Sequence, residues 1–387
     1  MKICFVCNEY PPAPHGGIGT FIYNLAHELV KNNFEVFVIG FDSRVNKKSQ
    51  WYEEVGIKVF RIYSPFRNFP IMRIKNYEIS LLFLLERTYL SNIIKKYNKQ
   101  YRFDIIESYD WSGPLMFKPS EPLIIRFHGA NTAYQYYEGL KISHLLKYIE
   151  KRNVLMGDAL VSVSKHIGDV TLQSLAIHNR NYSVIYNGIN TNHFMPNYNK
   201  IKSYEVLYVG SITRRKGIYS LLKIIPLVLE KVPEASFHLI GKFPSEDEGK
   251  RIKNQLQSSL SDSMRQRVNF LGVIPYGEIA EWFSRAAVSV FPAYAEACPM
   301  VWLESMACGS PIVLTNRASG PEIIEDGKSG LIADPDKPDE FAGKIVQILQ
   351  DHSLSKYLSN NVRQRVIEEF DIKVISKQNI EYYKEVL

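Results

Sequence analysis

The sequence is poor in cysteine and has no long apolar run. Four cysteines in 387 residues are too few for a disulfide framework, and such a chain fits a reducing compartment. The longest apolar block, Ile79–Leu85, is far shorter than the ~20 residues that a membrane-spanning helix needs. The first residues have the pattern of a strand and not of a secretory signal with its cleavage site. We therefore expect a cytoplasmic protein.

Two short patterns resemble parts of metal sites, but neither is complete. Cys4 and Cys7 lie on a predicted strand, where their side chains face opposite ways, and there is no second cysteine pair. Asp334 and Asp336 imitate an Asp-x-Asp motif, but they lie in a proline-rich loop far from the other candidate residues. We interpret the cysteines as core residues and expect no metal.

Positive charge is concentrated in the first half of the chain. Residues 1–195 carry 23 Lys and Arg against 16 Asp and Glu, whereas the remainder carries 24 of each. A basic surface can meet a membrane, a lipid phosphate or a nucleic acid, or it can be a solvated face with no partner. In Pro65–Lys75, basic residues alternate with aromatic and apolar ones, which favours contact with a membrane surface or an acceptor. We expect an anionic membrane surface as a partner at the inner face of the membrane, and no nucleic acid.

Two long stretches alternate between apolar strands and amphipathic helices, which is typical of parallel α/β sheets. A polar segment without periodicity, Asn192–Ser203, separates them and is the predicted linker. We therefore predict domains over 1–195 and 196–370, with a terminal helix over 371–387 that packs back on the first domain. The predicted strands of the two domains include Lys2–Cys7, Glu35–Gly40, Ile57–Tyr63, Leu123–Phe127, Ala159–Val163, Val206–Val209, Ser236–Gly241, Val268–Leu271, Ala286–Phe291 and Pro311–Leu314.

The stretch after Ala286–Phe291 carries two carboxylates beside a helix. Pro299 stands at a plausible first helical position and Gly309 ends the helix. Glu296 lies in the loop, and Glu304 lies inside the helix with a side chain that leans back toward the loop. A helix N-terminus suits a phosphate. We expect a solvated mouth that holds a diphosphate between two hydroxyl-binding carboxylates.

Three further patterns follow predicted strands. His128 precedes Gly129 at a strand end, where an imidazole can bind or transfer a proton, although a lone histidine is more often structural. Gly16 and Gly17 permit close approach of a ligand, or serve a tight turn. The loop Arg214–Lys216 is a candidate phosphate contact, or an exposed basic turn. From the residues alone, the chain is a two-domain α/β protein with a nucleotide or phosphate site in the cleft at the carboxyl ends of its strands.

These motifs, in this order, resemble family 4 of the retaining glycosyltransferases, which have the GT-B fold of two Rossmann-like domains facing across a cleft. The resemblance covers nearly the whole chain. It rests on Glu296 and Glu304 with seven residues between them and on Gly16-Gly17, His128-Gly129, Asn187-Gly188-Ile189, Gly210, Lys216-Gly217, Gly241, Gly272 and Pro321-Glu322.

The resemblance implies transfer of a hexose-type sugar, with retained anomeric configuration, from a nucleotide-diphosphate sugar to a saccharide or lipid-linked acceptor. No metal or other cofactor is implied, and the common setting is surface polysaccharide or glycolipid assembly. Glu304 would bind the ribose, Glu296 a sugar hydroxyl, and Lys216 with a neighbouring arginine the diphosphate. The remaining implied residues are Gly210, Arg214, Arg215, Cys298, Pro299, Met300 and Val301 for the donor, Gly272 and Ile274 for the base, His128, Gly16 and Gly17 at the reaction centre, and Tyr10, Asp110 and Asn131 on the acceptor side.

Two positions depart from the family pattern. The family often has arginine after the glycine at 210, where this chain has Ser211, so that Arg214 or Arg215 must supply the charge. The family often has Phe-Gly where this chain has Cys298-Pro299. Because proline has no N–H, one backbone donor is missing beside the expected donor sugar.

Two alternatives remain open at this point. A sugar-nucleotide epimerase on the same fold would bind a nucleotide sugar without a second sugar, although the spacing of Glu296 and Glu304 argues against it. A non-catalytic protein would bind the nucleotide sugar and leave it unchanged. The presence of His128, Lys216 and both glutamates counts against loss of catalysis.

Overall fold

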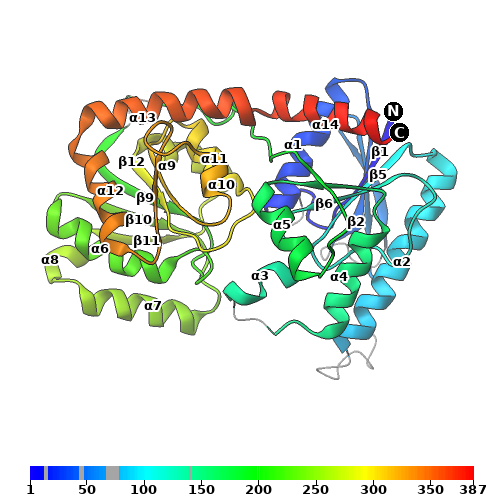
Figure 1. Cartoon of the computed structure of the whole chain (residues 1–387), viewed down its shortest axis with the longest axis horizontal. Helices are drawn as coiled ribbons and strands as arrows, with labels where there is room; N and C mark the ends of the chain where they lie inside the picture. Colours follow the sequence, from blue (N-terminus) through cyan, green and yellow to red (C-terminus); the bar gives the residue numbers. More distant parts are fainter. Residues whose placement is uncertain (13–15, 43–47, 67–77, 139–140, 198, 200) are drawn as a thin grey trace. The chain divides into compact units, whose positions relative to one another are not determined.

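The computed structural model describes the chain except residues 13–15, 43–47, 67–77, 139–140, 198 and 200. It divides into two compact units, Met1–Gly188 with Ile372–Leu387 and Ile189–Asp371 (Figure 1). Each unit is a sheet covered by helices, so the two α/β domains expected from the sequence are confirmed. Residues 67–75 of the segment Pro65–Lys75, for which a membrane contact is expected, lie outside the described residues.

Unit 1 contains an eight-stranded sheet in the order β3-β4-β2-β1-β5-β6-β7-β8. All neighbouring strands are parallel except β3 and β4, so the carboxyl ends of the parallel strands meet at one edge. The strands are β1 (Lys2–Val6), β2 (Glu35–Phe41), β3 (Gln50–Glu54), β4 (Ile57–Ile62), β5 (Ile105–Tyr109), β6 (Leu123–Phe127), β7 (Ala159–Ser162) and β8 (Ser183–Val184). The helices are α1 (Gly17–Lys31), α2 (Glu78–Tyr101), α3 (Asn131–Glu138), α4 (His144–Met156), α5 (Lys165–Ser174) and α14 (Ile372–Val386).

The antiparallel strand β3 was not predicted. It pairs with β4 from Gln50↔Arg61 to Glu54↔Ile57, and the turn between them places Val55 and Gly56 at φ values of 49° and 81°. The strand is a partly exposed edge whose residues are polar or aromatic, so it lacks the continuous apolar run that identifies a buried parallel strand.

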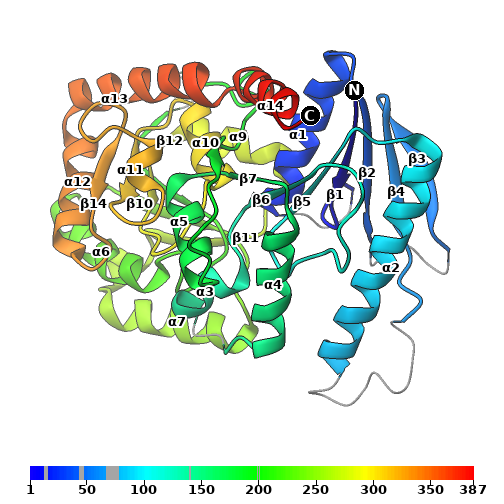
Figure 2. The same cartoon turned by 45° about the vertical axis from the view of Figure 1, so that its right-hand side comes forward.

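The last helix of the chain, α14, belongs to unit 1, where it packs against α1 (Figures 1 and 2). A buried ion pair lies beneath it: the Arg126 Nε lies 2.6 Å from the Glu107 Oε1, and both side chains are almost fully buried. From α14, the Tyr383 hydroxyl donates to the Glu107 Oε2 at 2.7 Å and the Asn379 Oδ1 accepts from Arg126 at 2.5 Å. Residues more than 250 positions apart thus complete one polar cluster.

Unit 2 contains a six-stranded sheet, all parallel, in the order β11-β10-β9-β12-β13-β14. The strands are β9 (Lys202–Val209), β10 (Ser236–Ile240), β11 (Val268–Gly272), β12 (Ala286–Phe291), β13 (Ile312–Thr315) and β14 (Leu331–Ala333). The helices are α6 (Ile218–Lys231), α7 (Glu246–Ser259), α8 (Asp262–Arg265), α9 (Tyr276–Arg285), α10 (Met300–Ala307), α11 (Gly320–Ile323), α12 (Pro338–Gln350), α13 (His352–Arg365) and a π-helical turn (Val366–Phe370).

The core of unit 2 follows from the spacing of apolar residues along its helices. In α6, Ile218, Leu221 and Ile225 recur at helical intervals and are fully buried. They join one cluster with Val288 and Val290 of the central strand β12. The apolar face of α6 thereby covers the central strand of the sheet.

The boundary between the units falls after Gly188, before the predicted linker at Asn192–Ser203. The segment that begins at Ile189 is polar, but its backbone is bound within unit 2. The Arg363 guanidinium donates to the carbonyl oxygens of Thr191 and Phe194, at 3.0 Å each. The polar composition of this segment indicated a linker. Hydrogen bonds to Arg363, which is far away in the sequence, instead attach it to unit 2.

Membrane crossing requires both length and apolar character. Among the helices in the described ranges, none combines the two.

We expect the cluster beneath α14 to control the stability of unit 1. Replacing Glu107 with Ala leaves the Arg126 charge buried and unpaired, which costs roughly 3–5 kcal/mol of unfolding free energy. Tyr383→Phe removes a single charged hydrogen bond and should cost roughly 1.5–3 kcal/mol.

Urea denaturation followed by circular dichroism measures both changes. Tyr148→Phe is the matched control, because Tyr148 is 62% exposed in the same unit and should change stability by less than about 0.5 kcal/mol. A Tyr383→Phe variant as stable as this control would contradict the prediction.

Candidate active site

Two loops of unit 2 meet at the carboxyl edge of its sheet because they follow the neighbouring strands β9 and β12. Gly217 closes the first loop at a φ of 82°. A Cβ at this position would lie 1.7 Å from the carbonyl oxygen of Pro292, so only glycine permits this close approach. The Tyr294 N–H also donates to the carbonyl oxygen of Arg215 at 2.8 Å. These contacts hold the basic loop, Arg214–Lys216, against the loop that carries Glu296.

Glu296 receives two cations from the basic loop. The Lys216 Nζ lies 2.6 Å and the Arg215 Nη1 lies 3.1 Å from the Glu296 Oε1. Arg215 also donates to the carbonyl oxygen of Ala295 at 3.1 Å. Glu296 is only 5% exposed, so the expected solvated mouth is wrong for this residue, because pairing with two cations offsets its burial. Two positive charges against one negative charge leave the cluster with a net positive charge for an anion.

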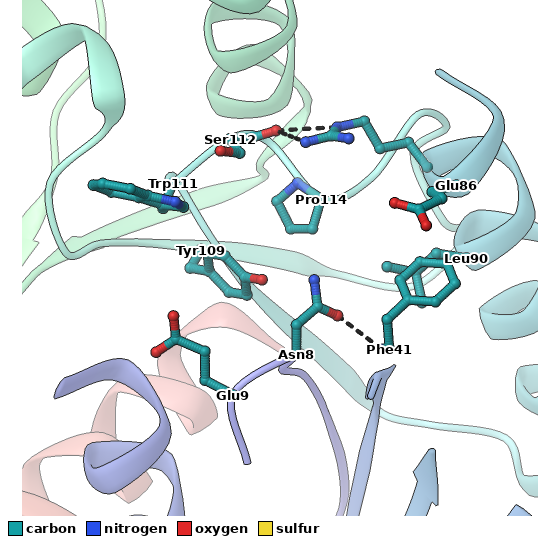
Figure 3. A pocket seen from close by; sticks show the side chains of 10 residues that line it. Asn8, Glu9, Phe41, Glu86, Leu90, Tyr109, Trp111, Ser112 and Pro114 are labelled. Atoms are coloured by element: carbon teal, nitrogen blue, oxygen red, sulfur yellow. Dashed lines mark hydrogen bonds between the residues drawn. The ribbon is translucent and has the colours of Figure 1, made fainter. Parts of the chain in front are cut away.

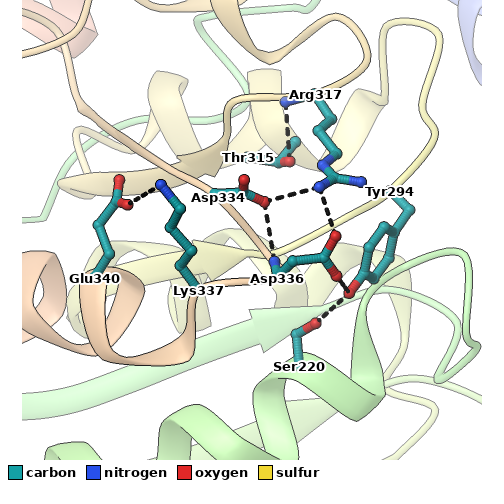
Figure 4. A network of polar contacts seen from close by, with 8 residues as sticks. All are labelled: Ser220, Tyr294, Thr315, Arg317, Asp334, Asp336, Lys337 and Glu340. Carbon is teal, nitrogen blue, oxygen red and sulfur yellow. Dashed lines mark hydrogen bonds and ion pairs between the residues drawn. The ribbon is translucent and has the colours of Figure 1, made fainter.

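A polar network binds the same loop through Tyr294 (Figure 4). The Tyr294 hydroxyl donates to the Asp336 Oδ1 at 2.6 Å and lies 2.9 Å from the Ser220 Oγ. Arg317 lies above the Tyr294 ring and pairs with both Asp334 and Asp336. Asp334 and Asp336 thus bind Arg317, and Asp336 also binds Tyr294. Over the residues that the structure describes, no group of three or more His, Cys, Asp and Glu could hold a metal.

Glu304 lies on the second turn of α10, buried to 2% exposure. The Tyr276 hydroxyl, at the start of α9, donates to its Oε1 at 3.0 Å. Burial raises the pKa of Glu304 to about 7, although the hydrogen bond from Tyr276 acts in the opposite direction. The carboxyl therefore changes charge near neutral pH.

The start of α10 differs by one position from the expected one. Pro299 is the N-cap and Met300 the first helical residue, and no side chain caps this end. Cys298 and Met300 are buried, whereas Val301 is half-buried. The first-turn N–H groups and the helix dipole remain a suitable place for a phosphate, with one donor absent because residue 299 is proline.

The remaining predicted donor residues line the same sheet edge. The Gly210 N–H donates to Ile240, and the Gly241 N–H donates to the carbonyl oxygen of Gly272 at 2.8 Å. Ile274 is half-buried on the loop after β11, and Arg214 is exposed at the tip of the basic loop. Ser211, where the family often has arginine, is also exposed.

In unit 1, Asp110 shapes the end of β6. It is fully buried, and its two carboxylate oxygens accept the backbone N–H groups of His128 at 2.9 Å and Gly129 at 3.1 Å. Burial raises the pKa of Asp110 to about 7. Burial and the nearby Arg126 lower the pKa of His128 to about 3, so its imidazole is neutral at physiological pH.

The predicted acceptor-side residues do not share one environment. Asp110 and Tyr10 are both 0% exposed, which contradicts direct contact with an acceptor. The Asp110 carboxylate binds backbone N–H groups, and the Tyr10 ring packs beside Tyr23. Asn131 is half-buried, and its Nδ2 donates to the Ser112 Oγ and the Glu150 Oε1, at 2.8 Å each.

The glycine loop of unit 1 is tied to the carboxyl end of β1. Gly16 and Gly17 are exposed, and α1 begins at Gly17 with Gly16 as its N-cap. The Gly16 N–H donates to the Glu9 Oε2 at 3.1 Å. The helix therefore begins within the glycine pair itself, because Gly17 is its first residue.

Three residues of the site were missed by sequence reasoning. Tyr276 binds Glu304, Tyr294 supports the Glu296 loop, and Glu9 holds the Gly16 loop. All three follow predicted strands, and this placement is the only signal in the sequence that could have found them. Tyrosine and glutamate at a loop start are too common to indicate a site by themselves.

Comparisons with known families agree with this geometry. Residues 15–193 match the model of Glycosyltransferase Family 4, and residues 191–365 match the model of Glycosyl transferases group 1. An uncharacterized glycosyltransferase of Methanocaldococcus jannaschii is 27% identical over 99% of this chain and 98% of its own length. The alpha-maltose-1-phosphate synthase of Mycolicibacterium smegmatis is 23% identical, with the whole of both chains covered.

Solved structures share the fold at low sequence identity. Sucrose-phosphate synthase from Thermosynechococcus elongatus has a TM-score of 0.82 at 20% identity, covering 100% of this chain and 99% of its own. Anabaena Alr3699/HepE in complex with UDP and glucose has a TM-score of 0.75 at 17% identity, with both chains fully covered. With the two family models spanning nearly the whole sequence, the chain belongs to family 4 of the glycosyltransferases and has the GT-B fold.

Proposed function

We propose that this glycosyltransferase moves a hexose-type sugar from a nucleoside-diphosphate sugar to a saccharide or lipid-linked acceptor, with retention of anomeric configuration and without a metal. The observation that carries the proposal is the cluster of Lys216 and Arg215 on Glu296 beside the uncapped start of α10. Solved neighbours in complex with UDP or UDP-glucose make a uridine nucleotide the first donor to test.

Unit 2 would bind the donor with three sets of groups. The Glu304 carboxylate accepts the ribose hydroxyls from inside α10, and Gly272 with Ile274 contacts the base. Lys216 and Arg215, together with the first-turn N–H groups of α10, bind the diphosphate. Glu296 accepts a hydroxyl of the transferred sugar.

Charge on the leaving diphosphate is what these groups would stabilise. When the glycosidic bond breaks, negative charge develops on the bridging oxygen, and cations already in position lower the barrier. In the structure both cations pair with Glu296, so their side chains are ordered before the donor arrives. A metal is unnecessary in this scheme, because lysine, arginine and the helix dipole supply the positive charge.

Unit 1 would bind the acceptor and contribute His128 and the Gly16–Gly17 loop to the reaction centre. A neutral imidazole, as the pKa of about 3 implies, acts as a hydrogen-bond partner and not as a cation. We further propose a setting in surface polysaccharide or glycolipid assembly. Contact of the basic first half with an anionic membrane surface stays a prediction.

A panel of nucleotide sugars tests the proposal. The full chain is titrated calorimetrically with UDP-, GDP- and ADP-linked hexoses, and each mixture is then followed by chromatography. We expect one donor to bind and to be slowly hydrolysed to nucleoside diphosphate and sugar. Conversion to an epimer without nucleotide release would identify an epimerase, and an unchanged ligand would identify a binding protein.

Replacing Glu296 with Ala should separate donor binding from transfer. The variant loses the contact to the sugar hydroxyl, and we expect transfer to fall by roughly 100-fold or more. It also leaves Lys216 and Arg215 without their carboxylate, so the affinity for UDP should be maintained or increased. Glu296→Gln, which preserves shape, controls for lost packing. Full transfer activity in Glu296→Ala would refute the assigned role.

The raised pKa of Glu304 predicts a pH-dependent donor affinity. Below pH about 7 the carboxyl is protonated and accepts hydroxyl donors less well, so affinity should fall as the pH decreases from 8 to 6. Titrating UDP into the wild type and Glu304→Gln across this range isolates the effect, since the phosphates ionise alike in both. Parallel pH profiles for the two proteins would contradict the prediction.

A further inference from the structure

The carboxyl of Glu304 is bound by the protein through one of its two oxygens. The side chain is almost fully buried, and the Tyr276 hydroxyl donates to its Oε1 at 3.0 Å. Across the described part of the chain, no second protein group forms a hydrogen bond or an ion pair with this carboxyl. A buried acceptor without a partner is costly, so Oε2 is the atom that a hydroxyl of a ligand would satisfy.

The Tyr276 ring is itself held by the first residues of unit 2. His193 stacks on it, with an angle of 17° between the planes and 6.5 Å between the ring centroids, and Phe194 meets it edge-on at 5.8 Å. Phe194 is buried, and its carbonyl oxygen accepts from Arg363 at 3.0 Å. Aromatic contacts of this kind favour one orientation of the ring, so the hydroxyl is directed at Glu304 before a ligand binds.

The Tyr276 phenol stays a hydrogen-bond donor throughout the physiological pH range. Burial, together with the negative charge of Glu304, raises the pKa of Tyr276 above its ordinary value of 10, so the hydroxyl keeps its proton. A group that always donates makes Oε1 an acceptor in both charge states of the carboxyl. The ionised carboxyl then offers Oε2 to a ligand hydroxyl, whereas the protonated form carries its proton there.

Tyr276 also connects two parts of the candidate donor site. It is the first residue of α9, on the loop that follows β11 and includes Ile274. This loop is the one expected to contact the base, and Glu304 on α10 is the residue expected at the ribose. The Tyr276 hydroxyl therefore bridges the loop for the base and the carboxyl for the sugar of one nucleoside.

A tyrosine beside a carboxylate does not by itself have this arrangement. In unit 1, Tyr109 and Glu9 line one pocket (Figure 3), and the Glu9 Oε2 accepts the backbone N–H of Gly16 at 3.1 Å. A backbone donor stays in place when side chains are exchanged. Glu304 is instead held by a side-chain hydroxyl, so the removal of one oxygen atom, in Tyr276→Phe, releases its carboxyl.

We propose that Tyr276 is a positioning residue for the donor nucleotide: it holds the Glu304 Oε1 and thereby directs Oε2 at one hydroxyl of the ribose. The ribose in this statement rests on the proposed function, whereas the hold of Tyr276 on Glu304 does not. Because one carboxylate oxygen is already bound, a single strong contact to the ribose remains. One of the 2′ and 3′ hydroxyls therefore dominates recognition, and Tyr276 determines that preference.

Carbon NMR of the full chain with ¹³C-labelled glutamate side chains tests the hold on Glu304 without a ligand. Glu304→Gln assigns the resonance. We expect the carboxyl of the wild type to titrate with a pKa of about 7. In Tyr276→Phe the midpoint should rise by about one pH unit, because the lost hydrogen bond favours the charged form.

The other ionisable groups near this pair do not produce the same shift. Burial raises the pKa of the Cys308 thiol, on the residue after α10, to about 12, so the thiol stays neutral between pH 6 and 8. Arg363 donates to the carbonyl oxygens of Phe194 and Ala307 and stays charged. His193 is the same in the wild type and in Tyr276→Phe, so the comparison of the two proteins isolates the phenol.

Calorimetric titration at pH 8 tests the ribose contact. UDP, ADP and GDP are compared first, and the one that binds is then compared with its 2′-deoxy and 3′-deoxy forms. In the wild type we expect one deoxy form to bind at least tenfold more weakly than the parent nucleotide. Tyr276→Phe should reduce this ratio to about threefold or less.

Two further proteins serve as controls. Tyr204→Phe is matched in exposure, since Tyr204 is 41% exposed and Tyr276 42%. Tyr204 lies near the amino end of β9, so this change should leave the carboxyl midpoint and all affinities unchanged. In a Glu304→Gln background, Tyr276→Phe should have no further effect on the preference between the deoxy forms, because it acts through Glu304.

Three results would overturn the proposal: an unchanged midpoint of the Glu304 carboxyl in Tyr276→Phe, equal losses for the two deoxy forms in the wild type, or an effect of Tyr276→Phe that persists without Glu304. A merely structural role would weaken all three nucleotides alike and leave the midpoint unchanged. A raised midpoint beside no binding of any nucleoside diphosphate refutes the proposed function and supports the hold on Glu304. Nucleotide binding beside an unchanged midpoint refutes the positioning role.

Discussion

The close packing of the loop after β9 on the loop after β12 is the contact on which the candidate donor site depends. Gly217 removes the side chain that would collide with Pro292, and the two backbones then hydrogen-bond through Arg215 and Tyr294. At this separation both cations reach Glu296, and their charges offset the burial of its carboxylate. A steric requirement at one glycine therefore determines the electrostatics of the whole site.

Much of this arrangement could be predicted from the sequence, for identifiable reasons. Buried parallel strands are continuous apolar runs, so the central strands of both sheets were found, whereas the polar edge strand β3 was not. The candidate residues after strands were predicted to lie together because the carboxyl ends of parallel strands share one edge. Burial was predicted poorly: Glu296 was expected in solvent, and Tyr10 and Asp110 against an acceptor. Their environments depend on partners distant in sequence, such as Arg215 for Glu296, which no local pattern reveals.

Charge in unit 1 illustrates the same difference between composition and structure. The first half of the chain has a clear excess of lysine and arginine, which suggests an anionic partner. Two buried arginines of unit 1, Arg126 and Arg87, are instead bound by the Glu107 carboxylate and by backbone carbonyl oxygens. The net charge of a domain thus describes its long-range field, while the chemistry of a pocket depends on the few groups that line it.

The return of α14 to unit 1 has a consequence for synthesis. The buried Arg126 and Glu107 are translated long before Asn379 and Tyr383, which complete their hydrogen bonds. Unit 2, continuous from Ile189 to Asp371, has its full sequence earlier than unit 1 does. During synthesis, unit 2 is therefore complete before unit 1, although the sheet of unit 1 leaves the ribosome first. The Arg126–Glu107 pair in unit 1 gains its last hydrogen bonds only after α14 has been made.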